Sequence, residues 1–177
     1  MAFGAPLLLD STPAAGTLRE HTTEQGTPVL LYEAGEALRF DETAIRIGVR
    51  GVMNVLRATG MLRAISQRAL PVQPLRSHGS SWVRAPVSGV LRSYCGLGSA
   101  VHEGDLLGRI GDPVGGEDTE VCAGAGGVVI GQTSLPLVYE GEALFHIARV
   151  DDPAEAALAV RQSRRMAKSM PGVQRRG

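Results

Sequence analysis

The stretch that decides the fold occurs twice in the second half of the chain. Residues 83–91 read VRAPVSGVL and residues 121–129 read VCAGAGGVV, with valine, alanine, glycine and valine in step. A second pair recurs at nearly the same offset, because residues 101–110 read VHEGDLLGRI and residues 138–147 read VYEGEALFHI. Short β-type runs that are broken by Glu-Gly turns and repeated once predict a small all-β barrel or sandwich in which two similar halves complete one core.

The first part of the chain shows a different pattern, in which helices alternate with strands. The apolar run at residues 28–32 (PVLLY) has the length of a strand that is covered on both faces. The capping residues Thr17 and Asp41 predict two helices, one ending before Gly26 and one running to about Thr59. In the second helix apolar residues recur at spacings of three and four, which predicts a face that packs on a sheet: Ile45, Val49, Val52, Met53 and Leu56. One or two strands cannot make an independent sheet, so the segment is expected to be part of something larger.

These patterns divide the chain into four parts. Residues 1–65 form an α/β segment, residues 66–80 a connector, residues 81–150 the all-β domain, and residues 151–177 a helical or disordered tail that begins rich in alanine. The expected fold class is an α/β segment followed by an all-β domain.

The composition is that of a folded protein, with 44% hydrophobic and 20% charged residues. Lys plus Arg and Asp plus Glu number 18 each, so no net charge draws the chain to nucleic acid or to an anionic membrane, and neither partner is expected. Cys95 and Cys122 are too few for a disulfide framework, and the sequence starts without a signal-peptide pattern. A cytoplasmic location is therefore expected, and a homo-oligomer is left open.

Six stretches carry a resemblance to a known family: 31–40 (LYEAGEALRF), 48–56 (GVRGVMNVL), 84–90 (RAPVSGV), 101–108 (VHEGDLLG), 112–115 (DPVG) and 139–145 (YEGEALF). In this order they resemble the C-terminal portion of the succinylglutamate desuccinylase/aspartoacylase family, zinc-dependent deacylases related to the zinc carboxypeptidases. The resemblance covers most of residues 3–148. It implies that the α/β segment is the end of a zinc-carboxypeptidase-like sheet domain and that the β domain resembles a barrel-sandwich hybrid.

The resemblance implies a catalytic role for Glu33. In that family a glutamate at the end of a late strand, in a Glu-x-Gly setting, is the general base toward a zinc-bound water. Zinc lowers the pKa of its water, and the carboxylate takes the proton and returns it to the leaving amine. Without the resemblance, Glu33 would be read as a cap or an ion-pair partner at a strand end, and Glu36 is expected to be structural.

Zinc is the cofactor that the resemblance implies, but its ligands are expected outside this chain. The family holds zinc with a His-x-x-Glu pair and a later histidine, all of which precede the matched region. The string from His21 to Glu24 has that spacing, yet it falls in the first predicted helix, where the family has no ligands. Tyr139 corresponds to a substrate-contacting tyrosine of aspartoacylases, and the alternative is a tyrosine that packs at the domain interface.

Three functions remain in competition. The leading one is the C-terminal part of a zinc-dependent deacylase that hydrolyses an N-acyl amide of the N-acyl amino acid type and is inactive alone. The second is a noncatalytic binding module with a biotinyl/lipoyl-like barrel, although residues 112–120 lack the lysine that carries the cofactor and Lys168 is the only lysine. The third is a noncatalytic subunit that works through interactions. The coding sequence upstream of the chain distinguishes a truncated enzyme from a genuine short protein.

Overall fold

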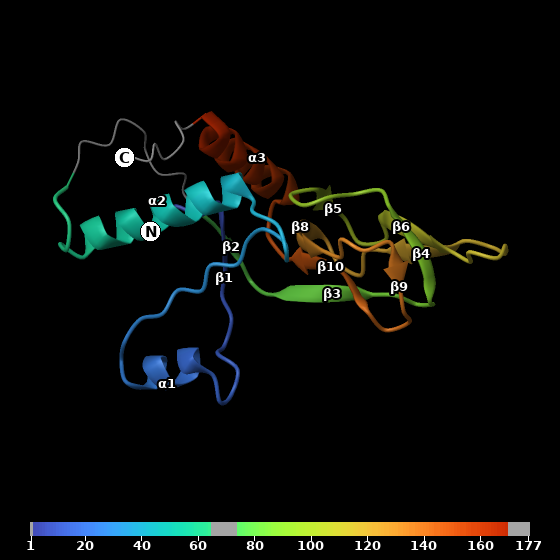
Figure 1. Ribbon diagram of the computed structural model, residues 1–177, viewed down its shortest axis with the longest axis horizontal. Coiled ribbons are helices and arrows are strands. Elements are labelled where there is room, and N and C mark those ends of the chain that lie inside the picture. Colours follow the sequence, from blue (N-terminus) through green and yellow to red (C-terminus); the bar gives the residue numbers. More distant parts are fainter. Residues whose placement is uncertain (1, 65–73, 170–177) are drawn as a thin grey trace.

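The computed structural model describes residues 2–64 and 74–169, which form a mixed α/β, sheet-rich fold (Figure 1). Its elements, in chain order, are β1 (Leu7–Leu9), α1 (Leu18–Glu24), α2 (Glu42–Ala58), β2 (Leu75–Ser77), β3 (Ser80–Arg84), β4 (Gly89–Ser93), β5 (Ala100–Val101), β6 (Leu106–Gly111), β7 (Thr119–Cys122), β8 (Gly127–Gln132), β9 (Leu137–Val138), β10 (Ala143–Ala148) and α3 (Pro153–Ser169). None of the described helices is long and apolar enough to cross a bilayer.

The strands from β3 to β10 form two four-stranded antiparallel sheets, with the orders β3-β10-β8-β5 and β7-β6-β4-β9. The strands β3, β4, β5 and β6 correspond in order to β7, β8, β9 and β10. Exchanging each strand for its counterpart converts the strand order of the first sheet into that of the second. The internal repeat predicted from the sequence is therefore confirmed as a repeat of topology. Each sheet takes two strands from each half, so the halves interlock and neither forms a sheet of its own.

One apolar core lies between these two sheets. Its completely or almost completely buried members come from both halves of the repeat: Leu107, Ile110, Val129, Val138, Leu144, Phe145 and Ile147. Burying one side chain of this size contributes about 1.5–3 kcal/mol. The interlocked halves are thus held together mainly by apolar burial.

The two Glu-Gly turns have the same geometry. In the first, the backbone N–H of His102 donates to Oδ2 of Asp105 at 2.7 Å, and in the second that of Tyr139 donates to Oε2 of Glu142 at 2.9 Å. Gly104 and Gly141 sit at the same place in the two turns, with φ of +85° and +83°, a region that favours glycine. The Glu-Gly signal therefore marks turns, as the sequence predicted.

Two glycines allow neighbouring strands within each sheet to approach closely. A Cβ on Gly89, at the start of β4, would lie 2.6 Å from the carbonyl oxygen of Gly111. A Cβ on Gly127, the matching residue of β8, would overlap the carbonyl oxygen of Ala148. The glycine shared by the two repeats is thus required by backbone packing.

The α/β part contains the parallel pair β1–β2, in which Leu7 faces Leu75, and helix α2. Oδ1 of Asp41 accepts hydrogen bonds from the first backbone N–H groups of α2, as predicted, and the helix ends before Thr59. Gly48 and Gly51 form a close-packed face of α2, because a Cβ on either would collide with the rings of Tyr32 and Phe3. Helix α1 is capped by Thr17, also as predicted, and lies away from the other helices and sheets (Figure 1).

Two expectations for the α/β part are wrong. Residues 28–32 form no strand but an extended segment in which Leu30 and Leu31 are 62% and 64% exposed. The predicted sheet-facing side of α2 is open as well, since Ile45, Val49 and Val52 are 41%, 50% and 54% exposed. The physical reason is common to both: a strand and a covering helix need neighbouring strands, and the described residues supply none at this place.

Helix α3 joins the two parts of the structure. It packs against α2, β1, β5 and β8 through small residues, among which Ala156, Ala157, Ser163 and Ala167 are buried (Figure 1). The predicted tail therefore contains a packed helix, and its last eight residues lie outside the described part. Much of the predicted connector also lies outside it. The described end of that connector contains β2, so the end is a strand rather than a linker.

Replacing Gly127 by alanine tests the close approach of β8 and β10. The added Cβ meets the backbone of Ala148, which cannot move without disturbing β10, so Gly127→Ala should lower the free energy of unfolding by about 1–3 kcal/mol. Gly124→Ala is the matched control, because nothing lies within 4 Å of a Cβ built there. Urea denaturation of both variants measures the difference, and equal stabilities would contradict the packing described here.

Candidate functional site

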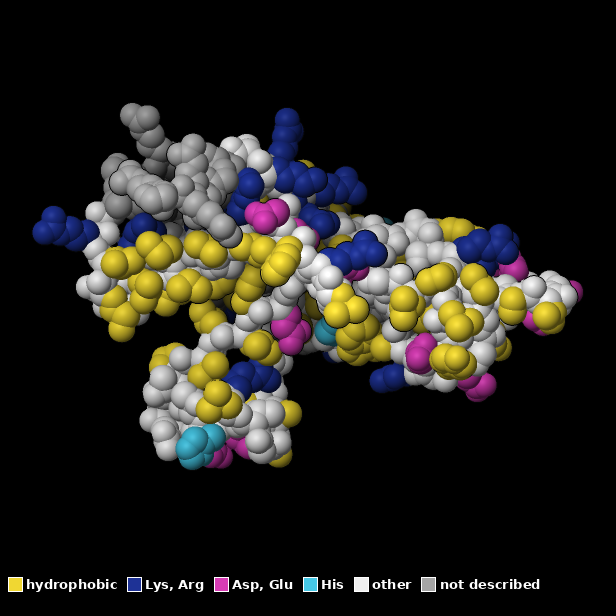
Figure 2. Space-filling model, in the orientation of Figure 1, with side chains coloured by type: hydrophobic (Ala, Val, Ile, Leu, Met, Phe, Trp, Pro, Cys, Tyr) yellow, Lys and Arg dark blue, Asp and Glu magenta, His cyan; other side chains and the backbone are white. Residues whose placement is uncertain are grey.

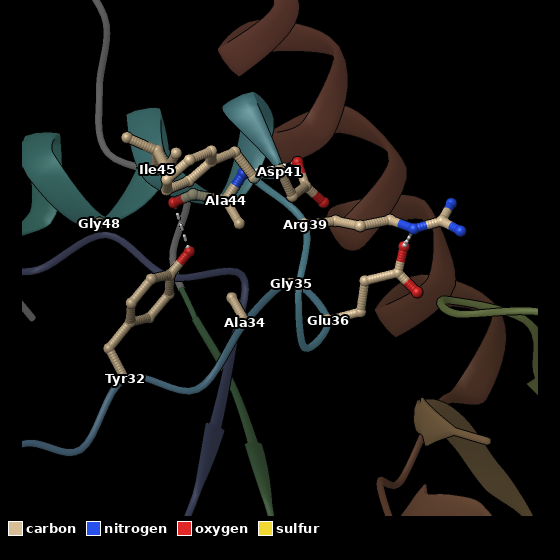
Figure 3. Close-up of a pocket in the computed structure, with 10 residues that line it drawn as sticks. Tyr32, Ala34, Gly35, Glu36, Arg39, Asp41, Ala44, Ile45 and Gly48 are labelled. Carbon is tan, nitrogen blue, oxygen red and sulfur yellow. Dashed lines mark hydrogen bonds and ion pairs between the residues drawn. The ribbon is translucent and has the colours of Figure 1, made fainter. Parts of the chain in front are cut away.

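Tyr32 anchors the segment that carries the predicted catalytic residue. Its hydroxyl donates a hydrogen bond of 2.9 Å to the carbonyl oxygen of Ala44, and its ring lies 5.3 Å from that of Phe3, centre to centre (Figure 3). Burial, and then the negative charge of Asp41, raise the pKa of the Tyr32 hydroxyl. Tyr32 thus remains a neutral donor that fixes residues 32–34 beneath α2.

Glu36 ties the same segment to the β domain. Oγ of Ser134, in the loop between β8 and β9, donates a hydrogen bond of 3.0 Å to Oε2 of Glu36. The other carboxylate oxygen lies 3.6 Å from Nε of Arg39 (Figure 3). The structural role expected for Glu36 agrees with these contacts, since they hold the turn between the two parts of the chain.

An open hollow of about 190 Å³ lies between this turn and α2. Figure 3 shows the residues around it: Tyr32, Ala34, Gly35, Glu36, Arg39, Phe40, Asp41, Ala44, Ile45 and Gly48. Glu33 is not among them, although both its neighbours in sequence are.

The electrostatic effect of Glu33 shows that it lies near the β domain. Burial lowers the pKa of the His146 imidazole on β10, and the negative charge of Glu33 opposes that shift. Glu33 itself is exposed and forms no ion pair with another described residue. The structure therefore brings an accessible carboxylate close to a histidine of the β domain, across the junction of the two parts.

His146 belongs to a cross-strand row that the sequence analysis missed. Its ring stacks on Trp82 of β3, with centres 4.3 Å apart and planes 10° from parallel, and Nε2 lies 2.7 Å from Oγ of Ser80. Gly131 of β8 is paired with His146 on the other side, and a Cβ there would be 3.2 Å from that of His146. A signal was available, because His146 lies between the core residues Phe145 and Ile147 and so must face outward.

No interaction joins Glu33 to Tyr139, or to the string from His21 to Glu24 that was not expected to hold metal. Tyr139 lies in the turn before β10, exposed, with its backbone bonded to Glu142. His21 and Glu24 lie on the separate helix α1, where His21 Nε2 is 3.1 Å from the Gln25 amide nitrogen. Within residues 2–64 and 74–169 no three His, Cys, Asp or Glu side chains are grouped so that they could hold a metal ion.

Comparison with solved structures decides the relationship. A succinylglutamate desuccinylase/aspartoacylase from Rhodobacter sphaeroides is 24% identical with a TM-score of 0.73, and the match covers 86% of this chain and 48% of that one. The chain has the fold of part of a succinylglutamate desuccinylase/aspartoacylase family protein. The product-bound ectoine utilization protein EutE (DoeB) from Ruegeria pomeroyi is similar as well, at 25% identity and a TM-score of 0.74, over 84% of this chain and 46% of that one.

A third similar structure, an aspartoacylase family protein from Mesorhizobium loti, is 22% identical with a TM-score of 0.65 over 85% of this chain and 46% of that one. The chain thus spans about half the length of the family structures it matches. No family model and no curated protein matches the sequence. The resemblance predicted from the sequence motifs is confirmed by the fold.

Replacing Glu33 by glutamine tests its proximity to His146. Removing the negative charge removes the interaction that favours the imidazolium, so the pKa of His146 should fall further below its usual range. Titration followed by the NMR signals of the histidine rings, assigned with a His146→Gln variant, measures the change. Glu103→Gln is the control, since the charge of Glu103 does not act on His146. An unchanged pKa in Glu33→Gln would place Glu33 elsewhere.

Proposed function

We propose that the chain is part of a zinc-dependent deacylase that hydrolyses a small N-acyl amide of the N-acyl amino acid type, with Glu33 as the general base. Its fold is shared with part of family hydrolases, which supports hydrolase-type chemistry. The observation that carries the assignment to Glu33 is an accessible carboxylate whose charge acts on His146 of the β domain and opposes the lowering of its imidazole pKa by burial. No nucleic acid or membrane is proposed as partner, and a cytoplasmic location is proposed from the two free cysteines.

The chemistry fits what the residues around Glu33 can do. A general base must be ionised and must reach the attacking water, and Glu33 is exposed and makes no ion pair with a described residue. It can accept the proton of the water and then hand it to the departing amine nitrogen. Trp82, which is 47% exposed and stacked on His146, offers an apolar surface for part of a substrate. Substrate contact by Tyr139 is a weaker part of the same proposal.

Zinc cannot be held by the described residues alone. They contain no group of three metal-ligating side chains, so the donor set does not fit the metal that the family implies. No step of the reaction is therefore assigned to zinc here. We infer that the ligands come from polypeptide outside the described residues, and that the described part is inactive by itself.

A noncatalytic binding module is the second candidate. The repeated topology of the two sheets favours it, since biotinyl and lipoyl carriers use a two-fold barrel, and a barrel-sandwich hybrid is the finer description proposed for this domain. The hairpin between β6 and β7, where a carrier presents its lysine, has Asp112, Val114 and Glu117 but no lysine. Such a module would act by binding rather than by carrying a cofactor.

A reconstituted catalytic domain tests the hydrolase proposal. The chain is produced together with the polypeptide that carries the other half of the family fold and is assayed against a panel of N-acyl amino acids. Glu33→Gln should lower kcat by about 10²–10⁴-fold, the usual contribution of a general base. Glu36→Gln should keep most of the activity, because the amide oxygen can still accept the hydrogen bond of Ser134. Full activity in Glu33→Gln would refute the assignment.

Metal analysis tests where the zinc ligands lie. The purified chain alone should bind zinc no more tightly than roughly millimolar, because isolated histidines and carboxylates do not make a chelating site. Dialysis against micromolar zinc followed by atomic emission should therefore find far less than one equivalent. A tight stoichiometric site would show that the chain carries its own ligand set.

A further inference from the structure

Helix α2 has two faces that differ in their packing. The face with Gly48 and Gly51 is covered by Tyr32 and Phe3. The apolar face, defined here as Ile45, Val49 and Val52, is about half exposed along the helix. Figure 2 shows hydrophobic side chains exposed along α2. Large exposed apolar bands on a folded protein mark contact surfaces.

The segment of residues 28–31 also lacks partners among the described residues. No backbone N–H or C=O of Val29, Leu30 or Leu31 makes a hydrogen bond with another described residue, although the sequence favours a strand and the chain is extended. Their side chains are exposed as well. An open strand edge of this kind pairs readily with a further strand.

These two surfaces adjoin each other. Tyr32, which ends the extended segment, lies against Gly48, and Ile45 lines the hollow between that segment and α2. Helix α2 thus packs on Phe3 and Tyr32 with one face and leaves its apolar face half exposed. A helix with an apolar face of this kind covers a parallel sheet in α/β folds.

The length of the similar structures indicates what fills this place. They share the fold of this chain over 46–48% of their own length, so more than half of each has no counterpart here. The pair β1–β2 is parallel, and a parallel sheet continues by further parallel strands that are apolar on both faces. A second copy of this chain fits less well, because it offers a helix and the same edge rather than a set of strands.

We propose that the apolar face of α2 and residues 28–32 form an interface for a polypeptide that carries the other half of the family fold, whose edge strand pairs with residues 28–32. The strands next to that edge pack beneath Ile45, Val49 and Val52. The interface rests on the fold and not on the chemistry of Glu33, so it stands even if the chain is not catalytic.

Coexpression with that polypeptide tests the interface. The partner is encoded in the source genome either upstream of the chain or as a separate gene, and the two are produced as separate chains. Native mass spectrometry should show a complex of one copy of each, and hydrogen exchange at residues 29–31 should slow at least tenfold on binding. The absence of such a gene, the absence of a complex, or a stable homodimer protected on α2 would each overturn the proposal.

Variants at exposed positions separate the interface from the fold. Val49→Lys and Val52→Lys should each weaken the complex at least tenfold, whereas Val114→Lys, the same change at a more exposed valine in the β6–β7 hairpin, should not. Leu30→Pro removes the N–H needed for strand pairing and should abolish the complex, while Leu30→Ala, which keeps it, should weaken binding less. Circular dichroism checks that each variant keeps its helices. A complex that tolerates all of these changes would also overturn the proposal, whatever its enzymatic activity.

Discussion

The structure depends on the burial of apolar surface: each sheet and each amphipathic helix must cover its apolar face. In the β domain neither half of the repeat can cover its own apolar face, and the solution is interlocking: each sheet draws strands from both halves, and one core lies between the sheets. Gly89 and Gly127 let neighbouring strands within each sheet pair closely, since a side chain there would collide with the backbone of the adjacent strand. The sequence repeat thus reflects a packing requirement, because the two halves bury their apolar faces only together.

The same requirement is not met within the described α/β part. Helix α2 has a well-formed cap and a consistent apolar stripe, yet the stripe faces outward, and the strand-like segment before it pairs with nothing described. Burial of one such side chain is worth about 1.5–3 kcal/mol, so an uncovered stripe is costly. The β domain is thus closed, whereas the described α/β part is open.

The position of the site follows from how the two parts are joined. Helix α3 packs on elements of both, Ser77 Oγ lies 2.8 Å from the carbonyl oxygen of Arg149, and Ser134 holds Glu36. In this arrangement the charge of Glu33 acts on His146, whose ring stacks on Trp82. In the proposed function, one part supplies the base and the other an apolar surface.

The sequence by itself determined the features that depend on local chemistry. The repeat, the Glu-Gly turns, and the caps Thr17 and Asp41 were predictable because each rests on residues within a few positions of one another. Only the tertiary structure decided the rest. The strand expected at residues 28–32 is absent because a strand requires a hydrogen-bonded neighbour, which no local pattern guarantees. The partnership of Glu33 with His146, and of His146 with Trp82, was likewise hidden, since register and the joining of two parts bring together residues that lie far apart in the chain.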